Sequence, residues 1–103
     1  MEDIGARIEG AVAAWEGVSV HEHRFGGREF RYGRRELGHL HGDHALHLGF
    51  PKDVWKRLYD EGRIDYHPVF PGKPGWGART IGDEADVEDV IAMLRLNYER
   101  SVN

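Results

Sequence analysis

The fold is decided by residues 17–50, which read GVSVHEHRFGGREFRYGRRELGHLHGDHALHLGF. Short runs rich in β-branched, aromatic and leucine residues alternate with polar residues here, and glycines interrupt them. Three of the interruptions, at 25–28, 32–35 and 41–44, are typical of two-residue hairpin turns. The stretch therefore predicts an antiparallel meander of four strands.

The register that these turns impose can be tested by charge. Two-residue turns place Arg24 opposite Glu29, and they place Arg31 opposite both Glu22 and Glu36. Opposite charges that face each other across strands are expected on a solvated sheet face. The other face then carries the residues that we expect in the core: Phe25, Phe30, Tyr32, Leu37, Leu46, Leu48 and Phe50.

The two ends of the meander behave differently. Val18 and Val20 fall on the charged face, and this misfit predicts a bulge or a twist near the start of the first strand. At the other end, Pro51 suits the first turn of a helix that Gly62 ends. Residues 63–70 are expected to be extended.

Helices are also predicted at both ends of the chain. Apolar residues at helical spacing predict an amphipathic helix over residues 3–16. A rigid Pro-Gly loop at 71–75 precedes a predicted strand at 76–81. Asp83 or Asp86 is expected to cap a closing helix. The predicted fold class is α+β, an antiparallel meander sheet of four or more strands whose N-terminal, middle and C-terminal helices mainly cover one face.

Composition narrows the classes of protein. A chain of 103 residues with 40% hydrophobic and 31% charged residues predicts one globular domain, residues 1–103. Cysteine is absent, which excludes disulfides and fits a reducing compartment. We expect no membrane span and no secretion signal, and hence a cytoplasmic protein. The net charge of -4 argues against a nucleic-acid partner.

The predicted register also gathers histidines. It places five of the seven on the helix-covered face, namely His21, His23, His39, His41 and His44. His47 points to the opposite face, and His67 lies beyond the second helix. Arg28 is expected beside His39, and Asp43 lies in the adjoining turn. The expected site is therefore a histidine-bearing edge at one tip of the sheet.

Two kinds of binding site are compatible with this edge. Arg28, His39 and His41 would form a cationic recess for a small anionic ligand, with Asp43 in the adjoining turn and the Pro-Gly loop closing it. His67 and Trp76 flank that loop and would line the same recess. A satisfied core edge is the alternative for the recess, and core packing is the preferred interpretation of Trp76.

The second kind of site is a metal centre. His39, His41 and His44 would bind zinc or another divalent metal, with a fourth position open to water. Solvated imidazoles at a wet hairpin tip are the alternative. Catalysis finds little other support, because neither a serine-nucleophile motif nor a phosphate loop is present.

Three hypotheses about function follow from these residues. The sequence favours a non-enzymatic domain that binds a small anionic ligand or a protein partner. A metal-dependent or histidine-based enzyme that uses His39, His41 and His44 is the alternative. A pH-responsive interaction surface is the third hypothesis, since imidazoles titrate near neutral pH.

The chain resembles the small luciferase-like domain family over nearly its whole length, and the sequence GHLHGD at 38–43 is the most specific piece. The stretches that carry the resemblance are 7–9, 15–18, 23–27, 36–43, 50–51, 62–63, 71–76 and 94–100. The resemblance implies no set of catalytic residues, and no flavin is expected, since flavin-dependent luciferases are far larger barrels. His44 and His47 stand where the family would be less rich in histidine. In layout alone, the chain is similar to MmcQ/YjbR-like domains.

Overall fold

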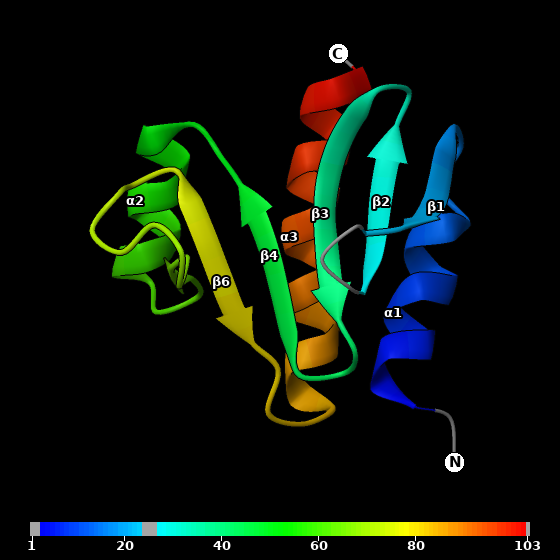
Figure 1. Cartoon of the computed structure of the whole chain (residues 1–103), viewed down its shortest axis with the longest axis horizontal. Helices are drawn as coiled ribbons and strands as arrows, with labels where there is room; N and C mark the ends of the chain where they lie inside the picture. Colours follow the sequence, from blue (N-terminus) through cyan, green and yellow to red (C-terminus); the bar gives the residue numbers. More distant parts are fainter. Residues whose placement is uncertain (1–2, 24–26, 103) are drawn as a thin grey trace.

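The computed structural model describes residues 3–23 and 27–102, and Figure 1 shows how its helices and strands follow one another. They run in the order α1 (Ile4–Ala13), β1 (Val18–Glu22), β2 (Arg28–Tyr32), β3 (Arg35–His41), β4 (Ala45–Gly49), α2 (Lys52–Asp60), β5 (Asp65–Tyr66), β6 (Trp76–Thr80) and α3 (Ala85–Val102). The strands form one antiparallel sheet in the order β1-β2-β3-β4-β6-β5. The α+β prediction is confirmed, and the meander is extended by β6 and β5.

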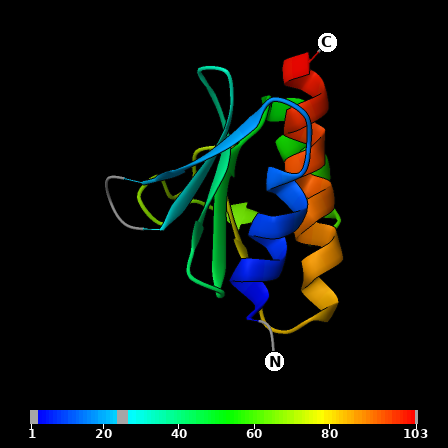
Figure 2. The ribbon, with the colours of Figure 1, turned by 90° about the vertical axis from the view of Figure 1, so that its right-hand side faces the viewer.

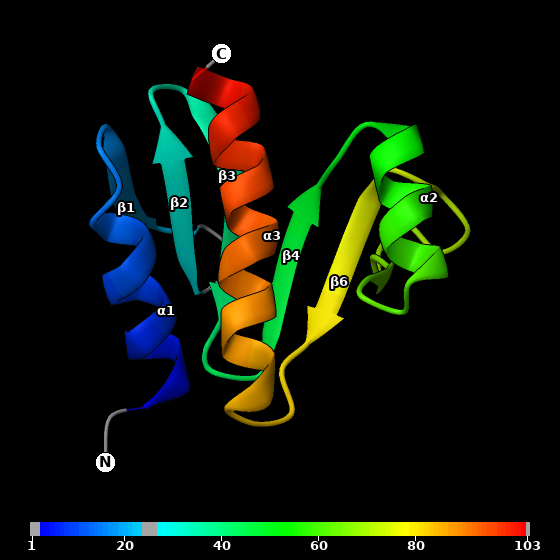
Figure 3. The ribbon, with the colours of Figure 1, turned by 180° about the vertical axis from the view of Figure 1, so that it is seen from behind.

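The three helices lie on the same side of the sheet (Figures 2 and 3). The core fills the space between them and the sheet, and its largest buried side chains are Trp55, Phe30, Ile8, Leu37, Leu40, Leu46, Leu48, Leu58, Met93 and Leu94. The other side of the sheet carries no helix in the part of the chain that the structure describes. We call that side the open face. No described helix is both long enough and apolar enough to cross a lipid bilayer.

Side-chain caps explain where two of the helices begin. The carboxylate of Asp3 accepts a hydrogen bond from the backbone N–H of Ala6 at 3.0 Å, so α1 begins as predicted and ends earlier, at Ala13. Asp83 accepts from the N–H of Ala85 at 2.9 Å at the start of α3. Asp83 therefore caps the closing helix in the predicted way.

Buried polar bonds fix α3 against the rest of the molecule. The amide nitrogen of Asn97 donates to the carbonyl of Leu37 at 3.0 Å and to that of Gly49 at 2.8 Å. The hydroxyl of Tyr98 donates to the carbonyl of Glu16 at 2.7 Å. Because each bond satisfies a backbone group that the helix layer covers, α3 has one position over the sheet.

The first hairpin corrects the predicted register. Glu22 pairs with Arg28, so the loop spans residues 23–27 instead of two residues; Arg24 and Phe25 lie outside the described residues. Val18 and Val20 consequently lie on the core side, where they pack against the core. Their misfit came from the assumed length of the turn, and no bulge at the start of β1 is needed.

Candidate functional site

Five imidazoles lie next to one another on the open face. They come from the end of β1, from β3, from β4 and from the segment after β5, and they are His23, His39, His41, His47 and His67. We call them the histidine row. The distance between ring centroids is 4.0 Å for His23–His39, 5.0 Å for His39–His41, 4.5 Å for His41–His47 and 4.4 Å for His47–His67.

A β-bulge turns two of these residues to the open face. The register of β2 and β3 shifts between Phe30 and Arg31, so Phe30 pairs with Gly38 instead of the residue before it. One extra residue in a strand moves every later side chain to the other face of the sheet. The prediction that His39 and His41 lie on the helix-covered face is therefore wrong.

Close packing against α3 holds the bulge in place. A Cβ atom added at Gly38 would lie 2.9 Å from Cδ2 of Leu94 and 3.1 Å from Cβ of Leu48. The neighbouring carbonyl, that of Leu37, accepts the hydrogen bond from Asn97. A glycine is thus required where the strand meets the helix, and the amide of Asn97 satisfies a backbone group beside the bulge.

The turn after β3 contains three residues, 42–44, and not two as predicted. This length places His39 directly opposite His47 on β4. His44, which a two-residue turn would pair with His41, lies in the turn, and its side chain is 74% exposed. Of the predicted cluster of His39, His41 and His44, the first two lie side by side and His44 lies in the turn. The group of possible metal ligands on His39 contains His47 and His67 instead of His41 and His44.

His67 reaches the row from the far edge of the sheet. Ala78 of β6 pairs with His47 on one side and with Asp65 of β5 on the other, so these residues form one cross-strand line. His67 lies two residues beyond Asp65, just after β5. Strand β6 lies between His47 and His67, and it presents only the small side chain of Ala78 at this point. The Nδ1 atom of His67 accepts a hydrogen bond from the N–H of Val69 at 3.1 Å.

Two carboxylates contact the other end of the row. Nδ1 of His39 lies 3.1 Å from Oε2 of Glu36, and because a carboxylate can only accept, the ring nitrogen donates. Nε2 of His39 therefore keeps its lone pair. The ring of His23 stacks on that of His39 at an angle of 15°, and its Nε2 lies 3.8 Å from the buried carboxylate of Glu29.

The environment keeps most of the row uncharged. Burial and the repulsion of neighbouring imidazoles lower the pKa of His47 to about 4, and the same two causes lower the pKa of His41. Burial, followed by repulsion from His39, lowers the pKa of His67. Burial alone would raise the pKa of Glu36, but its interactions with His39, Glu29 and His23 together outweigh burial and lower it. His41, His47 and His67 are therefore neutral imidazoles at neutral pH.

Ligand-type atoms converge at two places in the row. His39, His47 and His67 can each direct one nitrogen to a common position, with those atoms all within 4.8 Å of one another. His23, Glu36 and His39 form a second such group. Because Glu36 already accepts from Nδ1 of His39, the second group is explained as a carboxylate that orients a histidine.

An exposed apolar segment borders the row beside His67. Val69, Phe70 and Trp76 are 71%, 37% and 50% exposed, and they are three of the five large hydrophobic residues that are exposed among the described residues. The ring of Phe70 lies 5.5 Å from that of His67 and 5.7 Å from that of Trp76. We call Phe70 and Trp76, together with the neighbouring Val69, the aromatic patch. The predicted core position of Trp76 is wrong, since its ring lies over Gly49 on the open face.

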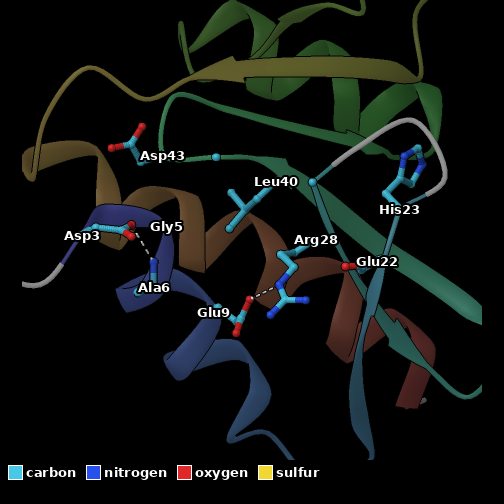
Figure 4. Close-up of a pocket in the computed structure, with 11 residues that line it drawn as sticks. Asp3, Gly5, Ala6, Glu9, Glu22, His23, Arg28, Leu40 and Asp43 are labelled. Atoms are coloured by element: carbon cyan, nitrogen blue, oxygen red, sulfur yellow. Dashed lines mark hydrogen bonds and ion pairs between the residues drawn. The ribbon is translucent and has the colours of Figure 1, made fainter.

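The predicted anion recess does not form. Arg28 lies on the helix side of the sheet, where its Nε donates to Oε1 of Glu9 in α1 at 2.9 Å (Figure 4). Four carboxylates line the recess around the guanidinium of Arg28, and they belong to Asp3, Glu9, Glu22 and Asp43. Arg28 and Asp43 are thus separated from His39 and His41, which the bulge turns to the open face.

Comparisons with known proteins give one result. A model of a family described as the luciferase domain matches residues 34–97, well over half of the chain. Searches of curated proteins and of solved structures found no match. The matched segment begins at the end of the second hairpin turn and ends in α3, so it contains the bulge and four members of the histidine row. The chain is a member of the luciferase domain family.

Proposed function

We propose that the open face binds a divalent transition-metal cation, with Zn²⁺ as the reference ion and His39, His47 and His67 as its ligands. The observation that carries the proposal is the convergence of three imidazole nitrogens within 4.8 Å of one another on three different segments of the chain. Nitrogens that bind one zinc ion at about 2.0–2.1 Å lie at most about 4.2 Å apart, so small rotations of the three side chains complete the site when the metal binds.

The charge state of the row favours a cation over an anion. Metal binding requires neutral imidazoles with free lone pairs, and the lowered pKa values of His47 and His67 supply them at neutral pH. An anion would instead need protonated rings or a guanidinium. The one arginine that the sequence offered for this role, Arg28, is paired with Glu9 on the other side of the sheet.

Two hydrogen bonds determine which ring nitrogen of His39 and of His67 is free to bind the metal. Glu36 fixes Nδ1 of His39 as the protonated nitrogen, so Nε2 is the available ligand atom. His67 needs a rearrangement, because the N–H of Val69 points at its Nδ1 and leaves the proton on Nε2. We expect the ring of His67 to exchange this single hydrogen bond for a metal bond, which is the stronger of the two.

Three protein ligands leave a fourth position for water or for a small ligand. Such a position distinguishes zinc sites that act on a ligand from structural sites, in which four protein ligands enclose the metal. The proposal therefore retains the metal-dependent alternative of the sequence with a changed ligand set. Since His47 stands where the family resemblance suggests less histidine, we propose the site for this chain and not for the family.

Calorimetric titration of the chelator-treated protein with Zn²⁺ at neutral pH tests the proposal. We expect one equivalent to bind with micromolar or tighter affinity, and we expect His47→Ala and His67→Ala each to weaken binding at least 100-fold. The matched control is His44→Ala, since the side chain of His44 is 74% exposed in the turn and does not belong to the proposed ligand set. Absence of heat with the wild type, or equal loss in the control, would contradict the proposal.

We also propose a cytoplasmic location. The proposal rests on the absence of cysteine from all 103 residues, which suits a reducing compartment. Fractionation of cells that produce the protein at its natural level provides the test, and its recovery from an extracellular fraction would contradict it.

A further inference from the structure

The aromatic patch lies where a ligand bound to the proposed metal would extend. His67 belongs to the metal-binding set, and its ring is the nearest imidazole to the patch, with ring centroids 5.5 Å from Phe70 and 6.5 Å from Trp76. One small organic group is therefore long enough to reach from the fourth coordination position of the metal to these two rings. The patch and the metal position share one surface.

The two rings present usable faces to solvent. Trp76 is half exposed, and its indole lies over Gly49, whose added Cβ would be 3.7 Å from the six-membered ring. The planes of the Phe70 and Trp76 rings meet at 31°, with their centroids 5.7 Å apart, so the two rings form one apolar surface. Large exposed apolar residues are costly to solubility, and their concentration beside a group of polar ligand atoms is typical of a binding site.

The charges near the patch favour a negative donor group. Nζ of Lys73 lies 6.0 Å from the centre of the Phe70 ring, on the loop that carries the patch. A divalent cation held by three neutral imidazoles keeps its full charge of two, so an anionic fourth ligand is favoured over a neutral one. A flat apolar body with an anionic oxygen donor therefore matches all three features.

We propose that the open face binds a small aromatic molecule through an anionic oxygen donor on the metal, with the aromatic ring packed against Trp76 and Phe70. This inference rests on the proposed metal site. The proposed ligand is again small and anionic, but it binds at a different place from the recess that the sequence suggested. His39, His67 and Trp76 are common to both sites.

Two chelating probes that differ by one ring test the inference. Acetohydroxamate and benzohydroxamate bind zinc through the same pair of oxygens, and only benzohydroxamate carries a phenyl ring. Calorimetry on the zinc-loaded protein measures both affinities. We expect benzohydroxamate to bind about tenfold more tightly, as packing of one ring against two aromatic side chains allows.

Variants then separate the ring contact from the metal contact. Trp76→Ala and Phe70→Ala should each reduce the ratio of the two affinities toward one, while the affinity for Zn²⁺ and for acetohydroxamate stays unchanged. The control is Val102→Ala, an exposed apolar residue at the end of α3 that is 48% exposed. The same ratio in wild type and in Trp76→Ala would overturn the inference and leave the metal site intact.

A measurement on the wild type covers the case in which a variant fails to fold. Nuclear Overhauser effects between the phenyl protons of benzohydroxamate and the indole protons of Trp76 are expected in the zinc-loaded protein. Their absence while benzohydroxamate is bound would also overturn the inference. Failure of Zn²⁺ itself to bind would reject the proposed function instead, so the two failures are distinguishable.

Discussion

At the scale of single residues, the chemistry of the open face depends on which nitrogen of each imidazole carries the proton. Glu36 decides this for His39, because its carboxylate accepts from Nδ1 at 3.1 Å and leaves Nε2 free. The stacked ring of His23 restrains the plane of the same imidazole. A ligand whose tautomer and orientation are already fixed loses less entropy when it binds a metal.

Glu36 is therefore expected to act as a positioning residue for the metal site. We predict that Glu36→Ala weakens Zn²⁺ binding roughly 10- to 100-fold, the usual range for loss of a carboxylate that supports a metal-bound histidine. Glu36→Gln should retain part of the affinity, since an amide oxygen can still accept from Nδ1. Competition with a chromophoric chelator measures these affinities.

The control for this prediction is Glu99→Ala, which removes an exposed carboxylate paired only with Arg95 within α3. It should leave zinc affinity unchanged. Nitrogen chemical shifts of His39 supply an independent readout, since loss of Glu36 should mix its two tautomers in the metal-free protein. An unmixed tautomer in Glu36→Ala would show that the carboxylate does not set the protonated nitrogen.

At the scale of elements, the bulge in β3 determines what the sheet presents to solvent. Up to the bulge, β3 follows the register that charge pairing predicts, with Arg31 opposite Glu36. Beyond it, every side chain is turned over, so that Leu40 is buried and its neighbours His39 and His41 reach the open face. A strand without the extra residue would put both histidines under the helices, where burial without partners costs free energy.

The packing of Gly38 against α3 should be measurable as stability. We predict that Gly38→Ala lowers the free energy of unfolding by about 1–3 kcal/mol, because its Cβ would meet Leu94 at 2.9 Å in a close-packed core. Leu94→Ala should cost more by itself, about 2–5 kcal/mol, through the cavity that it leaves. Urea denaturation measures both changes.

The double variant provides the specific check. Because the added methyl group can occupy part of the space that Leu94→Ala vacates, the two changes should cost less together than the sum of their separate costs. Strict additivity would mean that Gly38 is required for a reason other than contact with Leu94. Gly10→Ala serves as the control, since a Cβ there meets nothing within 4 Å.

The sequence predicted the strands and helices, but it did not predict the lengths of the turns between them. Alternating apolar residues predicted the strands and the helices correctly, because burial imposes a period that the sequence displays. The lengths of the first and third turns, and the bulge, depend on contacts between distant residues such as Gly38 and Leu94 or Asn97 and Leu37. No local pattern records those contacts. Each error was an odd number of residues, and an odd shift moves side chains to the other face.

One signal of this grouping of histidines was nevertheless present in the sequence. His47 lies between Leu46 and Leu48, both of which are buried, so its alternation already assigned it to the side away from the core. His39 and His41 flank Leu40 in the same way. Reading each strand by its own alternation, without carrying the register across the turns, would have placed all three imidazoles together.

At the scale of the whole molecule, a network of charges joins the far side of the sheet to α3. Arg79 of β6 contacts Asp86 at 2.8 Å and Asp89 at 2.5 Å, and Arg63, which precedes β5, contacts Asp89 at 2.8 Å. The Arg79 side chain is only 15% exposed. The network therefore connects β6, the segment before β5 and the closing helix, and it holds the last two strands of the sheet order, β6 and β5, against α3.

The carboxylates of this network should make the stability of the fold depend on acid. Hydrogen bonds from Arg79 lower the pKa of Asp86. Burial alone would raise the pKa of Asp89, but its hydrogen bonds with Arg63 and Arg79 outweigh burial and lower it. Because the folded pKa lies below the unfolded value of about 3.9, the stabilisation is complete above about pH 4 and is lost as the pH falls through the folded pKa.

Asp89→Asn tests this linkage. At pH 7 we expect the free energy of unfolding of the variant to be about 1–3 kcal/mol lower than that of the wild type, because the partly buried Arg79 loses a charged partner. Below about pH 4 the difference from the wild type should shrink, since protonation removes the same charge from the wild type. Urea denaturation at pH 7, 5 and 3, with a chelator present to exclude metal binding, follows the difference. Asp53→Asn, an exposed change in the first turn of α2, provides the control.

Parallel curves for Asp89→Asn and the wild type across this range would mean that the network adds no stability of its own. The positions of β5 and β6, and with them of His67 and Trp76, would then depend on apolar packing and strand pairing alone.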